Sequence, residues 1–194
     1  PMIPGSIKIL STDPAQSNSG NIFFGLLANV LYGDVVSDDT IGDILPKIKA
    51  YYNRMGFQQK SSGDIFDLFI SNPYTYPLLV GYENQLIEYA VQNSDNYSID
   101  FLKKNIRTLY PQPTVWSSHP LIAVNEKGQR LMQALKDPEI QQIAWETHGF
   151  RSSVKGIRND PDKHKVSGLP EVITSIIQMP SAQTMDIILN TIKQ

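Results

Sequence analysis

The 194-residue sequence predicts an α/β fold in which helices flank a mixed sheet. Short runs rich in β-branched residues alternate with longer segments whose apolar residues recur every three or four positions, and this alternation is typical of α/β proteins. Hydrophobic residues make up 41% of the chain and charged residues 19%, as in an ordinary globular protein. The length suffices for one good core or two small lobes.

The first third of the chain predicts a strand followed by three helices. Residues 6–10 (SIKIL) alternate and are rich in Ile, which favours a strand. A half-buried helix follows and ends at Gly33. Its apolar face comprises Ile22, Phe23, Leu26, Leu27, Val30 and Leu31. A second helix is expected over residues 40–55, where Pro46 either kinks it or marks its true start. A third begins at the polar cluster 61–64.

The middle of the chain predicts alternating strands and helices. A buried strand is expected over 75–83 (TYPLLVGYE), ending near Gly81, and a helix over 84–92. Residues 98–111 predict a helix that leads into a strand, and residues 119–125 (HPLIAVN) predict another strand.

The last third predicts helices separated by one polar loop. Two helices are expected over 126–137 and 138–149, divided at Asp137-Pro138, since proline suits the first turn of a helix. Residues 158–168 form a charged, turn-rich segment. A closing amphipathic helix over 181–194 is expected to be capped by Ser181.

Composition excludes several classes of function. The net charge is −2, with 17 Lys and Arg against 19 Asp and Glu and no basic block, so nucleic acid is not an expected partner. The chain has no Cys and no apolar run that could span a bilayer. Its first ten residues lack the basic start and apolar core of a signal peptide, which indicates a cytoplasmic protein or a mature or trimmed form.

The sequence carries no catalytic signature, so we expect no enzyme, no cofactor and no metal site. It contains neither G-x-S-x-G, H-E-x-x-H nor a glycine-rich phosphate loop. The three histidines, His119, His148 and His164, lie where structural or solvated roles are commonest. A Ser–His–Asp triad assembled from distant residues stays open, which leaves a hydrolase as the less favoured alternative.

Two polar clusters, 17–20 and 61–64, each open directly into an apolar helix. The first N–H groups of a helix have no intrahelical partner and carry partial positive charge. Small residues let a ligand approach them, so such a terminus can hold an anion or a polar oxygen without Lys or Arg. The same residues also serve as plain helix caps, and the sequence does not separate the two uses.

Three stretches resemble extracellular solute-binding proteins of ABC uptake systems, the type II periplasmic-binding-protein-like family. They are STDPAQSNSGN (11–21), KSSGDIFDLFI with PLLVGYENQLIEYA (60–70 and 77–90), and HPLIAVNEKGQRLMQALKDPEIQQIAWETHGFRS (119–152). The resemblance implies periplasmic-binding-protein-like lobes. It places the second lobe with its first crossing strand in residues 1–80, and the return crossing strand with the rest of the lobes in 81–194. It also implies that the N-terminal part of the first lobe is missing.

The resemblance implies a ligand site at the two helix starts and at the return strand. The expected ligand-binding residues are Ser17, Ser19, Gly20, Asn21, Ser61, Ser62, Asp64, Tyr82 and Glu83. Glu83 complicates binding of an oxyanion, because a carboxylate repels an anion unless it is protonated or paired. It would suit an amine, a cation or a sugar hydroxyl.

The expected function is therefore non-catalytic capture of a small polar solute, oxyanions included, outside the cytoplasm, for delivery to an ABC permease in the membrane. The alternative is a sensor or protein-interaction module that kept the fold without transport. A homodimer that pairs two truncated lobes is a further expectation. The sequence names neither the solute nor the oligomeric state.

Overall fold

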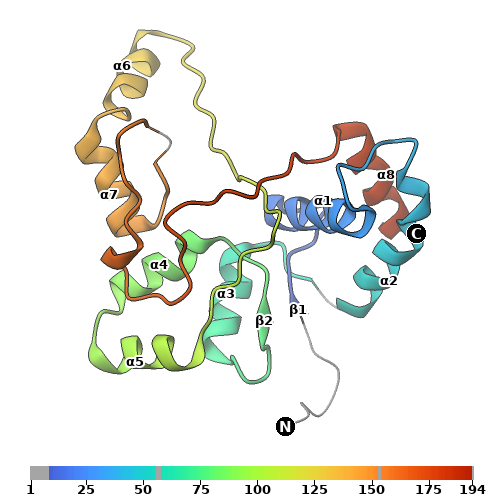
Figure 1. Cartoon of the computed structure of the whole chain (residues 1–194), viewed down its shortest axis with the longest axis horizontal. Helices are drawn as coiled ribbons and strands as arrows, with labels where there is room; N and C mark the ends of the chain where they lie inside the picture. Colours follow the sequence, from blue (N-terminus) through green and yellow to red (C-terminus); the bar gives the residue numbers. More distant parts are fainter. Residues whose placement is uncertain (1–8, 56–57, 153, 194) are drawn as a thin grey trace. The chain divides into compact units, whose positions relative to one another are not determined.

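The computed structural model describes residues 9–55, 58–152 and 154–193, and these are mostly helical (Figure 1). They form eight α-helices and one two-stranded parallel sheet with two residues in each strand. The expected mixed sheet is thus reduced, over these ranges, to a minimal parallel pair. No helix in them has the length and apolar character needed to cross a membrane.

The chain divides into two compact units, which are described separately here. The first unit comprises residues 1–81, 112–116 and 175–194, and the second comprises 82–111 and 117–174. The predicted boundary between residues 80 and 81 lies one position before the first change of unit. The C-terminal helix returns to the first unit.

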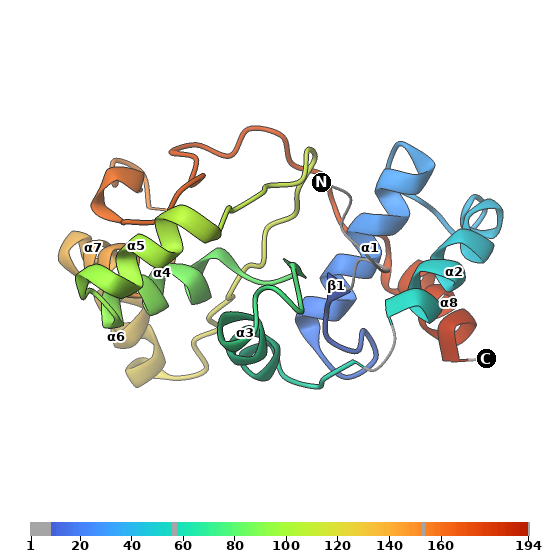
Figure 2. The ribbon, with the colours of Figure 1, turned by 90° about the horizontal axis from the view of Figure 1, so that it is seen from below.

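The first unit contains four α-helices, one 3-10 helix and the small sheet. Strand β1 pairs in parallel with β2, with Ile9 opposite Leu78. The elements are β1 (Ile9–Leu10), α1 (Asn18–Tyr32), the 3-10 helix η1 (Ile41–Asp43), α2 (Leu45–Met55), α3 (Ser62–Ser71), β2 (Leu78–Leu79) and α8 (Ala182–Lys193). Figures 1 and 2 both show α1, α2 and the C-terminal α8 side by side.

These three helices, with η1, enclose the core of the first unit. Asn29 of α1 is buried there, and its carboxamide donates to the Gln178 carbonyl at 2.8 Å and accepts from the Val36 N–H at 3.0 Å. A buried amide with both groups paired fixes the chain before α8 against α1. The buried apolar side chains are Phe24, Ala28, Val36, Ile41, Ile44, Ile48, Met185, Ile188 and Ile192.

The second unit is built around the packing of α4 on α7. Its elements are α4 (Glu83–Gln92), α5 (Asn96–Asn105), α6 (Glu126–Ala134), α7 (Pro138–His148) and the 3-10 helix η2 (Pro161–Lys163). Its fully or nearly buried apolar side chains are Ile87, Ala90, Ile99, Leu102, Ile106 and Trp145. Helix α6 contributes none, because all its residues keep some exposure.

Gly149 permits the contact between α4 and α7. It ends α7 with a φ of +71°, in the left-handed region. A Cβ at this position would lie 2.8 Å from the Asn84 Cα and 2.8 Å from the Ile87 Cβ. Both the backbone conformation and the close approach therefore require glycine.

Helix boundaries agree well with the sequence. Pro46 is the second residue of α2, so it marks the start of that helix. The Asp137 side chain caps α7, with Pro138 in its first turn. The Ser181 hydroxyl accepts from the Thr184 N–H at 3.0 Å, which confirms the predicted cap of α8.

Strand predictions were less successful. Residues 6–8 of the first expected strand lie outside the described ranges, while Ile9 and Leu10 are β1. Residues 119–125 are not a strand: Ile122 is 80% and Val124 87% exposed, with no paired neighbour in the described chain. The strand expected after α5 is also absent over 106–111. A β-branched run needs a backbone partner to become a strand, and local sequence does not provide one.

Gly149→Ala should destabilise the protein more than Gly156→Ala. Both glycines have positive φ, at +71° and +90°, but a Cβ at Gly156 meets nothing within 4 Å. The control should cost about 1 kcal/mol for the left-handed backbone alone. Gly149→Ala should cost about 2 kcal/mol more, because α4 must move. Urea unfolding followed by circular dichroism measures both, and equal costs would contradict this account of the α4–α7 contact.

Candidate functional site

The two joints of the first unit, the polar turns that lead into α1 and α3, lie against each other. Thr12, in the first joint, forms a parallel β-bridge with Gln59, which precedes the second joint. The Asp13 N–H donates to the Gln59 carbonyl at 2.9 Å. The structure therefore brings together the polar turns that open α1 and α3.

A pocket of about 470 Å³ opens beside this contact. Gln58 is one of its lining residues, and both polar atoms of the Gln58 carboxamide are buried without a hydrogen-bond partner in the described chain. Buried polar atoms are nearly always paired in proteins, so an unpaired carboxamide in a pocket wall indicates a missing partner. The lining residues are Asp13, Gln16, Tyr52, Gln58, Gln59, Lys60 and Asp64.

Local hydrogen bonds hold Asp13 in place. Its Oδ1 accepts from the Ala15 N–H at 2.8 Å, and its Oδ2 accepts from the Gln16 side chain at 2.5 Å. Such an Asx turn is a common way for Asp to order a polar loop. The carboxylate keeps further lone pairs on both oxygens for another donor.

Tyr52 joins the pocket to the core. Its ring packs edge-on against Phe24 of α1, with ring centroids 5.8 Å apart. Burial and, second, the negative charge of Asp13 raise the pKa of the Tyr52 hydroxyl. The phenol therefore stays protonated and remains a hydrogen-bond donor at neutral pH.

The first predicted cluster builds the joint and does not line the pocket. The buried Ser19 hydroxyl lies 2.7 Å from that of Thr12, and the Ser17 hydroxyl lies 3.1 Å from that of Ser19. A Cβ at Gly20 would lie 2.3 Å from the Thr12 carbonyl oxygen, so the chain crosses directly over the first turn of α1. The Asn21 carboxamide donates to the Pro14 carbonyl at 3.4 Å.

The second predicted cluster contributes one pocket residue. The Ser61 hydroxyl accepts from the Asp64 N–H at 3.3 Å and so caps α3. Ser62 is the first residue of that helix and is half-buried. Asp64 lies in the first turn and lines the pocket.

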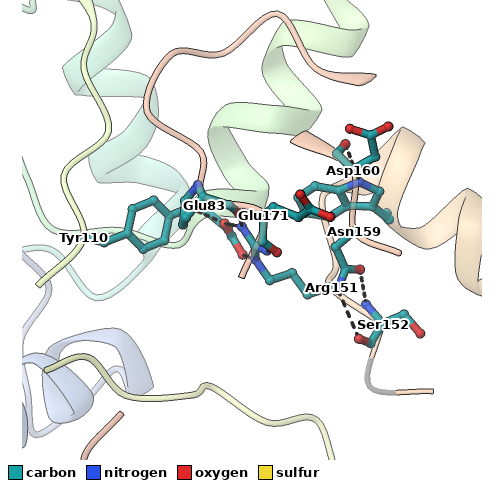
Figure 3. Close-up of polar contacts among 9 residues, drawn as sticks. Glu83, Tyr110, Arg151, Ser152, Asn159, Asp160 and Glu171 are labelled. Carbon is teal, nitrogen blue, oxygen red and sulfur yellow. Dashed lines mark hydrogen bonds and ion pairs between the residues drawn. The ribbon is translucent and has the colours of Figure 1, made fainter. Parts of the chain in front are cut away.

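Tyr82 and Glu83 belong to the second unit. Tyr82 is the N-cap residue of α4, and its N–H donates to the Gln85 side chain at 3.3 Å. Glu83 is paired: the Arg151 guanidinium donates to it from Nε at 2.6 Å and from Nη2 at 3.0 Å (Figure 3). The Tyr110 hydroxyl also donates to Glu83, and burial followed by this carboxylate's charge raises the pKa of Tyr110.

Arg151 is the centre of a polar network in the second unit. Besides Glu83, it donates to the Pro170 carbonyl at 2.7 Å and the Glu171 carbonyl at 3.0 Å. Its guanidinium carbon lies 4.9 Å from the centroid of the Trp145 ring, a cation–π contact. Arg151 lies at the end of the stretch 119–152 that carries the resemblance, but nothing local in the sequence indicates its pairing with Glu83, 68 positions away.

His164 packs against the same tryptophan. Its ring lies edge-on to Trp145 with centroids 4.6 Å apart, and both ring nitrogens are buried without a partner in the described chain. The Trp145 indole N–H donates to the Asp160 carbonyl at 3.0 Å. Burial lowers the pKa of His164, against the charges of Glu146, Glu83 and Asp160, which favour its protonation.

Sequence reasoning missed most of the pocket. Its lining residues Asp13 and Gln16 lie just before the first polar cluster, and Gln58, Gln59 and Lys60 lie just before the second. This closeness to the clusters was the only local sign that they line a pocket. Tyr52 of α2 contacts the core and also lines the pocket, and its place in the sequence indicates only a helix residue.

Comparisons of the chain with family models, curated proteins and solved structures found no match. Over the residues that the structure places, no group of three or more His, Asp or Glu side chains could hold a metal ion. The site must therefore be interpreted from its own geometry.

Arg151→Met should destabilise the second unit by about 3 kcal/mol, because it leaves the largely buried Glu83 carboxylate without its cationic partner. Adding Glu83→Gln should recover part of this loss, since the variant side chain carries no charge. Urea unfolding of both single variants and the double variant gives the coupling energy. Strictly additive losses would show that the ion pair contributes nothing.

The free energy of unfolding should fall as the pH drops through the range in which His164 takes up a proton. Its folded-state pKa lies below the usual 6.5, so the unfolded chain binds the proton more readily. The His164 contribution is therefore complete above about pH 6.5 and is lost below it. The free energy of unfolding should differ less between pH 7.5 and pH 5.5 in His164→Phe than in the unmodified protein. His119 and His148 are present in both proteins, so their contributions cancel in this comparison. If the two proteins show the same difference between the two pH values, His164 is not the group responsible for the loss of stability.

Proposed function

We propose that this protein binds a small polar solute, without transforming it, in the pocket of the first unit. The unpaired, buried carboxamide of Gln58 carries this proposal, because it needs a hydrogen-bond donor and an acceptor that the described chain does not supply. The volume of about 470 Å³ falls within the usual range of small-molecule sites.

The lining supports binding rather than catalysis. Three of its seven side chains are glutamine carboxamides, which donate and accept hydrogen bonds but seldom attack a substrate or transfer protons. Histidine and serine, the usual base and nucleophile, do not line it. Asp13 accepts two hydrogen bonds from its own turn, an arrangement that holds its carboxylate in place.

The biological setting in this proposal rests on the sequence resemblance. A solute-binding protein with periplasmic-binding-protein-like lobes would act outside the cytoplasm and deliver its ligand to an ABC permease. The turns that open α1 and α3 meet beside one pocket, and Asp64, to which the resemblance assigned a ligand contact, lines it, which supports this assignment.

A protein-interaction module is the second candidate, and one observation favours it. In the second unit, Ile122, Val124 and Leu131 are 80%, 87% and 51% exposed, respectively. Exposed apolar side chains that gather in one segment often mark a binding surface for another protein. This candidate predicts a response to a partner chain and none to small solutes.

Gln58→Ala should weaken solute binding about tenfold, because the variant cannot provide the hydrogen bonds of the pocket wall. A thermal-shift screen with amino acids, sugars, amines and oxyanions identifies a binder, which must raise the melting temperature by mass action. Calorimetric titration then compares Gln58→Ala with Gln129→Ala, an exposed glutamine of α6 in the second unit. The pocket assignment would be wrong if no compound of the panel raised the melting temperature. It would also be wrong if the two variants bound an identified compound with equal affinity.

A further inference from the structure

The charges around the pocket select the chemistry of its solute. Two carboxylates, Asp13 and Asp64, line it against a single ammonium, Lys60. Among the described residues, none of the three takes part in an ion pair with another side chain. The lining therefore carries one net negative charge, and its two carboxylates lack a cationic partner.

Neither helix start beside the pocket is suited to an anion. The segment 12–14 crosses the first turn of α1 so closely that a Cβ on Gly20 would lie 2.3 Å from the Thr12 carbonyl oxygen. At α3, the Ser61 hydroxyl already accepts from the Asp64 N–H, and the Asp64 carboxylate adds negative charge to the first turn. An oxyanion here would meet carbonyl and carboxylate oxygens.

The same groups suit a donor that carries positive charge. An ammonium group offers up to three N–H bonds, and the pocket offers acceptors on Asp13, Asp64 and Gln58. Tyr52 adds an aromatic ring to the lining residues, and aromatic rings attract cations. The field of Asp13 already reaches this phenol, as the raised pKa of Tyr52 indicates.

We infer that the solute of this pocket is a small organic cation with at least one protonated amine, such as a short diamine or amino alcohol. The inference rests on the proposed binding function and narrows it to one class of ligand. Asp13 and Asp64 would bind the ammonium group, and the Gln58 carboxamide would bind a second polar group of the solute. Lys60 opposes this binding through its like charge.

Three four-carbon probes of equal length test the sign of the charge. Calorimetric titration of the whole chain with 1,4-diaminobutane, 1,4-butanediol and succinate at pH 7 should rank the diamine first, the diol second and succinate last. Asp13→Asn and Asp64→Asn should each weaken diamine binding about tenfold, since each removes a charge from the pocket wall. Lys60→Gln should strengthen it about threefold.

Asp67→Asn is the matched control. Asp67 is exposed on the same helix as Asp64, lies outside the pocket lining and changes the net charge by the same amount. Its affinity for the diamine should stay within twofold of the unmodified protein. Equal losses in Asp64→Asn and Asp67→Asn would show attraction by overall charge and overturn the inference.

The outcomes separate the ligand class from the binding function. If succinate binds more tightly than the diamine, and Gln58→Ala weakens that binding, the inference of a cationic solute is wrong. The proposed binding function would then still hold. Silence from all three probes would overturn the inference, and the wider screen of amino acids, sugars and oxyanions would then decide the binding function independently.

Discussion

One backbone hydrogen bond, from the Asp13 N–H to the Gln59 carbonyl, organises the first unit. It belongs to the separate parallel bridge of Thr12 with Gln59, just after β1, and joins two turns that are more than forty positions apart in sequence. A sheet with two residues per strand has little stability of its own. The apolar contacts of α1, α2 and α8 must therefore hold the two turns in register.

Different residues of these turns shape the backbone and line the pocket. The smallest polar residues, Ser17, Ser19 and Gly20, form the internal contacts that let the chain cross over α1. Longer polar side chains just before them, among them Gln16 and Asp13, which lie one and four positions before Ser17, line the pocket instead. A joint of small residues thus positions larger neighbours without presenting its own side chains to the pocket.

The helices could be predicted from the sequence because their signals are local. Apolar spacing and caps such as Ser61 and Ser181 lie within a few residues of the boundary that they define. The strand expected at 119–125 depended on a distant partner, and the same holds for the contacts of Arg151 and Tyr52. The two polar clusters located the pocket approximately, but capping and ligand binding use the same residue types, so its lining needed the tertiary structure.

The contacts of Arg151 have a further consequence for the segment that follows it. By donating to the carbonyls of Pro170 and Glu171, this side chain closes a loop of about twenty residues, of which the described part contains one helical element, the 3-10 helix η2. Small proteins often close such loops with disulfides, but this chain contains no cysteine. The closure is therefore independent of redox conditions, and the loop can open and reclose without any covalent chemistry. Resistance of this loop to proteases should accordingly follow the strength of one guanidinium's hydrogen bonds.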